Sequence, residues 1–113
     1  MTQEGQRVIW QAESTHPDLA EAVKESLREV VDPEIGLSVI ELGLIRDVTI
    51  DSEKSHIKMI LTTPFCPYGP ALLEMTRQKA EQALGLPATI EIGMEMWDPT
   101  MMEEGAGAEW GLF

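Results

Sequence analysis

The sequence is poor in cysteine and in basic residues. Its 113 residues include one cysteine, Cys66, and 8 lysines and arginines against 20 acidic residues, which gives a net charge of −12. A single cysteine excludes an internal disulfide framework and suits a reducing compartment, so we predict a cytoplasmic protein. The acidic balance argues against a nucleic-acid partner, because phosphate contacts need clustered lysine and arginine.

Long apolar runs are also missing. No run approaches the length of a membrane span, and the first ten residues, MTQEGQRVIW, lack the apolar stretch of a secretory signal, so we expect no membrane partner. There is no internal repeat, no GxGxxG, no phosphate-binding loop and no nucleophile elbow. With 43% hydrophobic residues, the length fits one domain with a single core.

Two segments carry apolar residues at helical spacing. The first begins at residue 17 and ends at residue 31 or 32, because Pro33 disfavours helical geometry in the residue before it. The second spans about residues 70–84, and Gly85 is its expected C-cap. Each helix should bury one stripe against a common core.

Three segments alternate as strands do. Residues 43–51 and 56–62 predict a hairpin with one buried and one wetter face, joined by a turn at 52–55. Residues 90–96 follow the second helix, so a parallel crossover is expected. The sequence therefore predicts a two-layer α+β domain, in which two helices cover a small mixed sheet made of the hairpin and one crossover strand.

The two ends of the chain differ from this central domain. Residues 1–16 suggest an edge strand or packed arm through Val8, Trp10 and Ala12, with a mobile tail as the alternative. We place the domain at 17–102, with Asp98 ending the last strand and a short helical turn at 100–104. Residues 103–113 form an acidic, glycine-rich tail. No lysine or arginine follows Lys79, so the acidic stretch after this residue could meet a basic partner or be a solvated face.

Cys66 lies in a proline-rich loop between a predicted strand and a predicted helix, in residues 62–70. Free N–H groups at a helix start favour a thiolate, which is the form of cysteine that binds metals or attacks electrophiles. The alternative is a small buried side chain that caps the core. Thr62 and Thr63 either donate hydrogen bonds to sulfur or serve strand packing.

A second loop, residues 32–37, carries two carboxylates, Asp32 and Glu34. They suit metal or proton chemistry, or charge contacts with a partner. The alternative is a capping role, in which either carboxylate accepts hydrogen bonds from a turn or from a short helical piece at 39–42.

One thiolate cannot close a four-coordinate metal site. A chain with only Cys66 could hold an iron–sulfur cluster by sharing it across a homodimer, with another protein or with small thiols. Copper(I) is a minor option, because thioethers with one thiolate suit that ion. His16 and His56 lack ligands at zinc spacing and are interpreted as surface residues. The thioethers near the last strand are those of Met94, Met96, Met101 and Met102.

Four motifs occur together in one order. They are Asp-Pro-Glu-Ile-Gly at 32–36, Glu-Leu-Gly-Leu-Ile at 41–45, Thr-Thr-Pro-Phe-Cys-Pro at 62–67 and Trp-Asp-Pro at 97–99. Over residues 19–102 the chain resembles the SufT-like iron–sulfur cluster assembly domain, also called the metal–sulfur cluster biosynthetic domain. Relatives of that domain include the bacterial PaaD proteins and the eukaryotic cytosolic targeting factors for iron–sulfur maturation. The PaaD branch is disfavoured, because its cysteine-rich C-terminal segment is missing here.

The resemblance implies an α+β fold, a maturation role, a functional cysteine at Cys66 and a functional acidic loop at Asp32 and Glu34. We therefore predict an accessory or carrier protein, not an enzyme, that binds or relays a transient cluster or iron. Its predicted partners are an iron–sulfur scaffold or apo-protein clients, with a homodimer as an option. The alternatives are a metal-free adaptor that docks clients and a thiol redox enzyme. The residues predicted to meet partners are Trp97, Asp98, Met101 and Met102.

Overall fold

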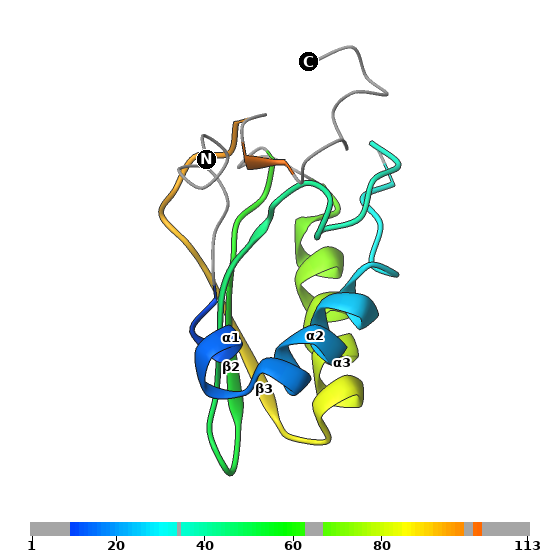
Figure 1. The fold of residues 1–113 in the computed structure, drawn as a ribbon. Helices are drawn as coiled ribbons and strands as arrows, with labels where there is room; N and C mark the ends of the chain where they lie inside the picture. Colours follow the sequence, from blue (N-terminus) through cyan, green and yellow to red (C-terminus); the bar gives the residue numbers. More distant parts are fainter. Residues whose placement is uncertain (1–9, 34, 63–66, 99–100, 103–113) are drawn as a thin grey trace.

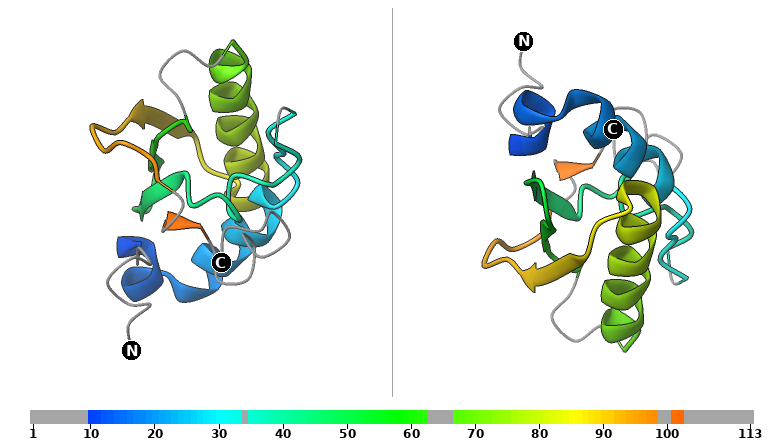
Figure 2. Two further views of the ribbon diagram at one scale, coloured as in Figure 1. Left: turned by 90° about the horizontal axis from the view of Figure 1, so that it is seen from above. Right: turned by 90° about the horizontal axis from the view of Figure 1, so that it is seen from below.

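The computed structural model describes residues 10–33, 35–62, 67–98 and 101–102. A small sheet forms one layer and helices form the other (Figures 1 and 2). This arrangement confirms the predicted α+β class, with a third, short helix added at the N-terminal side. The elements in chain order are α1 (Gln11–Thr15), α2 (Pro17–Leu27), β1 (Ile45–Ile50), β2 (Ser55–Met59), α3 (Gly69–Leu84) and β3 (Ala88–Ile92).

The sheet has the order β1-β2-β3, with an antiparallel β1/β2 pair and a parallel β2/β3 pair. The predicted hairpin and parallel crossover are both confirmed. Val48 lies opposite Ile57, which lies opposite Ile90, and this row faces the core. The neighbouring row, which contains His56 and Thr89, is partly or fully exposed on the other face. One face is therefore buried and the other is wet, because side chains alternate along each strand.

Helix α3 packs through a stripe with one buried residue per turn, at Leu72, Thr76 and Ala80. Pro70 lies in its first turn, where a missing N–H costs little. Gly85 ends the helix in the left-handed conformation at φ +69°, as expected for a glycine C-cap. The predicted second helix is thus confirmed within one residue at its start.

The end predicted for the first helix is wrong. Helix α2 ends at Leu27 instead of residue 31 or 32, and the chain leaves it in a turn. Val30 is fully buried from an extended segment, where its carbonyl accepts a hydrogen bond from the Val39 N–H. Val31 forms an antiparallel bridge with Ser38 and is exposed, so it does not belong to the helical stripe. Pairing with residues 38 and 39 competes with the last helical turn, which spacing alone cannot reveal.

The last strand is also shorter than predicted, because β3 ends at Ile92 and not at residue 96. The final ladder bond on this side runs from the Gly93 N–H to the Met59 carbonyl. The partner strand β2 ends at Met59, and the next residue, Ile60, donates its N–H to the Leu44 carbonyl on the β1 side. The alternating residues 93–96 therefore lose their neighbouring strand.

The described part of the N-terminal segment is a packed arm. Trp10 is buried, and its indole N–H donates to the Ile45 carbonyl at 3.1 Å. The Gln11 N–H donates to Asp47 Oδ1 at 2.9 Å, which fixes α1 along the outer edge of β1. Residues 1–9 and 103–113 lie outside the described residues, so the predicted domain limits stay predictions. None of the described helices combines the length and the apolar character needed to cross a bilayer.

Candidate functional site

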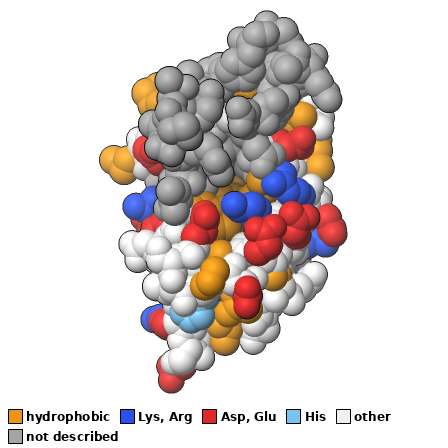
Figure 3. Space-filling view, in the orientation of Figure 1, with side chains coloured by type: hydrophobic (Ala, Val, Ile, Leu, Met, Phe, Trp, Pro, Cys, Tyr) orange, Lys and Arg blue, Asp and Glu red, His pale blue; other side chains and the backbone are white. Residues whose placement is uncertain are grey.

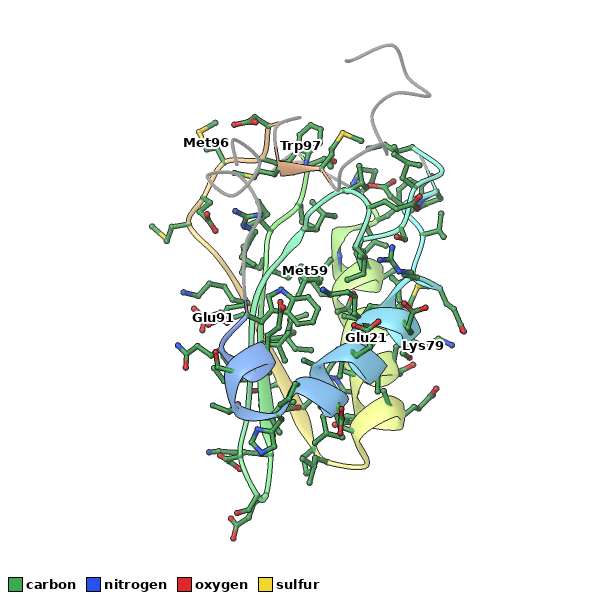
Figure 4. The ribbon with its side chains drawn as sticks, in the orientation of Figure 1. Glu21, Met59, Lys79, Glu91, Met96 and Trp97 are labelled. Carbon is green, nitrogen blue, oxygen red and sulfur yellow. The ribbon has the colours of Figure 1, made fainter. Side chains whose placement is uncertain are left out.

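The described parts of the two loops that carry the predicted site residues lie at one end of the molecule. In Figure 1 this end collects the loop after α2, the exit of β2, the start of α3 and the segment at 97–102. Figure 4 labels Trp97 at the same end, whereas the β1–β2 turn lies at the opposite end. The fold thus gathers there the described parts of motifs that lie more than sixty residues apart in sequence.

The first loop closes on the backbone of Asp32. The Asp32 N–H donates to the Leu37 carbonyl at 3.0 Å, and the Asp32 carbonyl accepts from Ile35 and Gly36 at 3.2 and 2.7 Å. Gly36 has φ +85°, a conformation that side chains disfavour, which explains glycine at this place. Asp32 is only 1% exposed, so the loop holds this acid inside the fold. Glu34 lies outside the described residues.

A reciprocal cap follows this loop. The Ser38 hydroxyl accepts from the Glu41 N–H at 3.1 Å, and the Glu41 carboxylate accepts from the Ser38 N–H at 2.9 Å. The Leu42 N–H then donates to the Ser38 carbonyl, so residues 38–42 make one helix-like turn. A short helical piece at 39–42 was among the predicted alternatives, but its cap is made by Ser38 and Glu41 and not by Asp32 or Glu34, and the Ser-x-x-Glu spacing is the usual signature of such a cap.

The second loop is pinned at its flanks. Leu61 and Thr62 follow β2 and are half-buried, and α3 begins at Gly69. Gly69 is buried, and a Cβ at this position would lie 2.8 Å from Leu61 Cδ1, so the two flanks are in contact. Residues 63–66, which include Thr63 and Cys66, lie outside the described residues.

In the sequence, Cys66 is therefore three residues ahead of the first residue of α3, one residue closer than the predicted start at about residue 70 implies. The N-cap position is Tyr68, whose side chain is exposed and makes no capping hydrogen bond. The first N–H groups of a helix have no partner within the helix and carry partial positive charge. A thiol placed against these N–H groups would be favoured in its anionic form.

The other two motifs contact each other beside these loops. The Trp97 indole N–H donates to the Leu42 carbonyl at 2.7 Å. Gly43 has φ +74°, and a Cβ there would overlap the Met101 carbonyl oxygen. Met102 is buried in the core. Trp97, Met101 and Met102 therefore pack against the turn that leads into β1 and its neighbouring core, and we call these three residues the strap.

This strap bears on the predicted partner-binding residues. Trp97 and Met102 have contacts within their own chain, and Met102 would reach a partner only if the strap moved away. Asp98 is exposed, and its carbonyl accepts the Met101 N–H. Of the helical turn predicted at 100–104, only residues 101 and 102 are described, so it stays a prediction. The partner-binding role of these four residues stays a prediction.

Within the described segments, no group of three or more His, Cys, Asp or Glu side chains is placed to hold a metal ion. The histidines have other neighbours: His16 Nδ1 lies 2.9 Å from the Thr15 hydroxyl. His56 lies between Thr89 and Glu91 on the wet face of the sheet. Any metal bound through Cys66 would thus need ligands beyond these described groups.

Charged side chains of opposite sign lie side by side over the helices and the sheet (Figure 3). Lys79 bonds Glu29 at 2.6 Å, and this hydrogen bond together with the Lys79 charge lowers the pKa of the Glu29 carboxyl. Arg77 lowers the pKa of Glu74 in the same way. Because acids outnumber bases by 20 to 8, such pairs leave a surplus of negative charge that suits a basic partner.

Comparison with known proteins agrees with this geometry. Residues 20–92 match the family model described as iron-sulfur cluster assembly protein. The chain is 36% identical over 95 residues to the Fe-S protein maturation auxiliary factor of Porphyromonas gingivalis, a match that covers 81% of this chain and 90% of that protein. It is 38% identical over 65 residues to the Fe-S protein maturation auxiliary factor YitW of Bacillus subtilis, covering 53% of this chain and 64% of that one.

A solved structure has the same fold. A domain of unknown function from Bacillus anthracis superposes with a TM-score of 0.78 at 21% identity, over 88% of this chain and 98% of that domain. At this identity the likeness concerns the fold alone, and the family rests on the sequence matches. These matches confirm the SufT-like resemblance and its association with iron–sulfur cluster assembly. The chain belongs to the iron–sulfur cluster assembly protein family.

Proposed function

We propose that this protein is an accessory factor that binds or relays an iron–sulfur cluster, or iron, through Cys66. The cluster is its cargo, received from an assembly scaffold and passed to apo-protein clients. The proposal is supported by the sequence position of the sole thiol, three residues before the first residue of α3, and by the contact between the described flanks of its loop, Leu61 and Gly69. In this role the protein is not an enzyme, and it works in the reducing cytoplasm.

The ligand count supports transient binding. One thiolate supplies one of the four ligands that an iron–sulfur cluster usually takes. The remaining ligands then come from a second molecule, and a cluster held in this way is exposed and labile. Lability is a defect in an electron carrier, but it suits a protein that hands its cluster on.

The acidic loop has a supporting role in this proposal. We predicted that Asp32 and Glu34 shape the neighbouring loop or contact clients. For Asp32, burial and the three backbone hydrogen bonds at this residue favour shaping the loop. Glu34 is then the member of the pair left to contact clients or iron. Thr62, at the described edge of the cysteine loop, and Thr63 would donate hydrogen bonds toward sulfur.

Anaerobic reconstitution with iron and sulfide tests the role of Cys66. We expect the wild type to retain both and Cys66→Ser to retain neither after desalting. The double variant Cys66→Ser/Ser52→Cys is the matched control, because it restores one thiol at an exposed position in the β1–β2 turn, at the far end of the molecule. We expect the double variant to behave like Cys66→Ser. Equal retention by the wild type and Cys66→Ser would overturn the proposal.

The alternative function is a metal-free adaptor that docks apo-protein clients to the assembly machinery. Exposed apolar residues beside both site loops favour it: Val31 directly precedes Asp32, and Tyr68 follows Cys66 by two residues. Client capture that survives Cys66→Ala and is lost in Tyr68→Glu would support the adaptor. Client capture lost in Cys66→Ala supports the carrier.

A further inference from the structure

The methionines at 94–102 differ widely in exposure. Met94 is 97% exposed and Met96 is 85% exposed, whereas Met101 is half-buried and Met102 is 6% exposed. We propose that Met94 and Met96 form a sacrificial oxidation site, which consumes peroxide before the peroxide reaches the thioethers of the strap, Met101 and Met102. This site goes beyond the proposed function and does not require Cys66.

The reaction at this site is the oxidation of a thioether to a sulfoxide. A sulfur lone pair attacks one oxygen of hydrogen peroxide, a sulfur–oxygen bond forms and the oxygen–oxygen bond breaks. The second oxygen leaves as water and takes both protons with it. The sulfur loses two electrons and the peroxide gains them, so no further reagent is needed. Because the peroxide has to reach the sulfur, susceptibility follows exposure.

Oxidation of the exposed pair should leave the fold intact. Both residues follow the last residue of β3, Ile92, and Figure 4 shows Met96 pointing away from the sheet. Glu95, which lies between them, holds this segment to the fold, because its Oε1 lies 3.2 Å from Arg46 Nε. A sulfoxide at residue 94 or 96 would therefore lie in water, where its polar oxygen is hydrated.

Oxidation of the strap should damage the fold. Met102 is buried in the hydrophobic core, where a polar sulfoxide would lose its contact with water. Met101 has little room to move, because a Cβ on Gly43 would overlap its carbonyl oxygen. Trp97, the third residue of the strap, directly follows Met96 in the sequence. The exposed pair thus immediately precedes the part of the chain that oxidation would harm.

The sulfur atom is what distinguishes this pair from other exposed apolar side chains. Met94 and Met96 are exposed, so leucine at either position would serve the fold equally well, since the hydrophobic effect requires area removed from water. What methionine adds there is a polarizable sulfur that peroxide oxidises. Met75 on α3 is 43% exposed and serves as the internal standard for a partly covered thioether.

Limited oxidation with hydrogen peroxide tests the proposal. The full-length Cys66→Ser chain is used, so that the thiol does not consume the oxidant and the result does not depend on the iron-binding proposal. Peptide mapping by mass spectrometry then gives the sulfoxide fraction at each methionine. We expect Met94 and Met96 to be oxidised roughly tenfold faster than Met102, in proportion to their exposure, with Met75 at an intermediate rate. The urea midpoint should not change while only Met94 and Met96 are oxidised.

Met94→Leu/Met96→Leu, made in the same chain, removes both thioethers and keeps apolar side chains of similar size. With the same limiting amount of peroxide, we expect the sulfoxide fraction at Met101 and Met102 to rise about twofold and the urea midpoint to fall. Met75→Leu is the matched control and should raise oxidation of the strap less, because its thioether is less exposed.

The single variants Met94→Leu and Met96→Leu replace the double variant if circular dichroism shows that it does not fold, and each should give a smaller rise. Oxidation of Met102 as fast as that of Met94 would overturn the proposal. An unchanged sulfoxide fraction at the strap in the double variant, or a rise in Met75→Leu as large as in the double variant, would do the same. Loss of stability after oxidation of Met94 and Met96 alone would also contradict it.

Discussion

The four motifs of this chain fall into two pairs with different physical roles. The motifs at 41–45 and 97–99 contact each other through the Trp97–Leu42 hydrogen bond, and Met101, just after the second motif, closely approaches Gly43. The motifs at 32–36 and 62–67 form loops at the same end, with the buried Asp32 in one and the sole thiol in the other. We infer that the first pair maintains the fold and that the second pair performs the chemistry. A motif shared with a family therefore need not be part of its site.

The largest expected loss of stability is that of Gly43→Ala, in the first pair of motifs, and it should exceed the loss caused by Gly36→Ala in the second pair. Gly43→Ala meets both an unfavourable positive φ and the Met101 carbonyl, so we expect a loss of about 3 kcal/mol in the free energy of unfolding. Gly36→Ala has the same backbone strain but nothing within 4 Å of the added Cβ, so about 1 kcal/mol should be lost. Urea unfolding of both variants measures the difference, and equal losses would mean that the strap does not constrain Gly43.

A smaller effect is expected at the strap itself. Trp97→Phe keeps most of the ring but removes the donor to the Leu42 carbonyl, which should cost about 1 kcal/mol. Tyr68→Phe, beside the cysteine loop, is the control, since an exposed side chain should change stability by less than about 0.5 kcal/mol. If urea unfolding finds Trp97→Phe as stable as the wild type, the strap does not stabilise the fold.

The smallest expected effect on stability comes from the His56–Glu91 pair, which lies on the wet face of the sheet, away from both pairs of motifs. The hydrogen bond from His56 lowers the pKa of the Glu91 carboxyl below its ordinary value. A lowered pKa stabilises the fold above the ordinary value, and this contribution is lost as pH falls through the lowered value. The contribution is small because the carboxyl is exposed.

His56→Ala should therefore raise the pKa of Glu91 toward its ordinary value. The free energy of unfolding of this variant should then fall less steeply as the pH is lowered through the acid range. Carboxyl-resolved NMR titration measures the pKa directly. Glu74, whose pKa is lowered by Arg77, serves as an internal reference and should not move. An unchanged Glu91 pKa in the variant would show that His56 is not the cause.

The regular elements were predictable because their patterns are local. Apolar residues at helical spacing, among them Leu72 and Ala80, and Gly85 after them define α3 by spacing alone, whereas the burial of Thr76 is not part of that apolar pattern. The alternation around Val48 and Ile57 likewise gives the hairpin. In each case the pattern of buried side chains lies within the helix or strand that it predicts.

The errors occurred where distant segments compete with a local pattern. The end of α2 depends on pairing of Val31 with Ser38, and the end of β3 coincides with the end of its partner β2 at Met59. The contact between the two structural motifs could not be read from spacing either, because Leu42 and Trp97 are 55 residues apart. The motifs predict which residues belong to the candidate site. They do not predict that Asp32 is buried, because its burial depends on how the rest of the chain packs around it.

Iron retention after anaerobic reconstitution, measured together with urea stability, tests the division between the two pairs of motifs most directly. Trp97→Phe should lose stability and retain as much iron per chain as the wild type. Cys66→Ser should unfold at the same urea concentration as the wild type and retain no iron. Iron retained by Cys66→Ser at the level of the wild type would contradict the account.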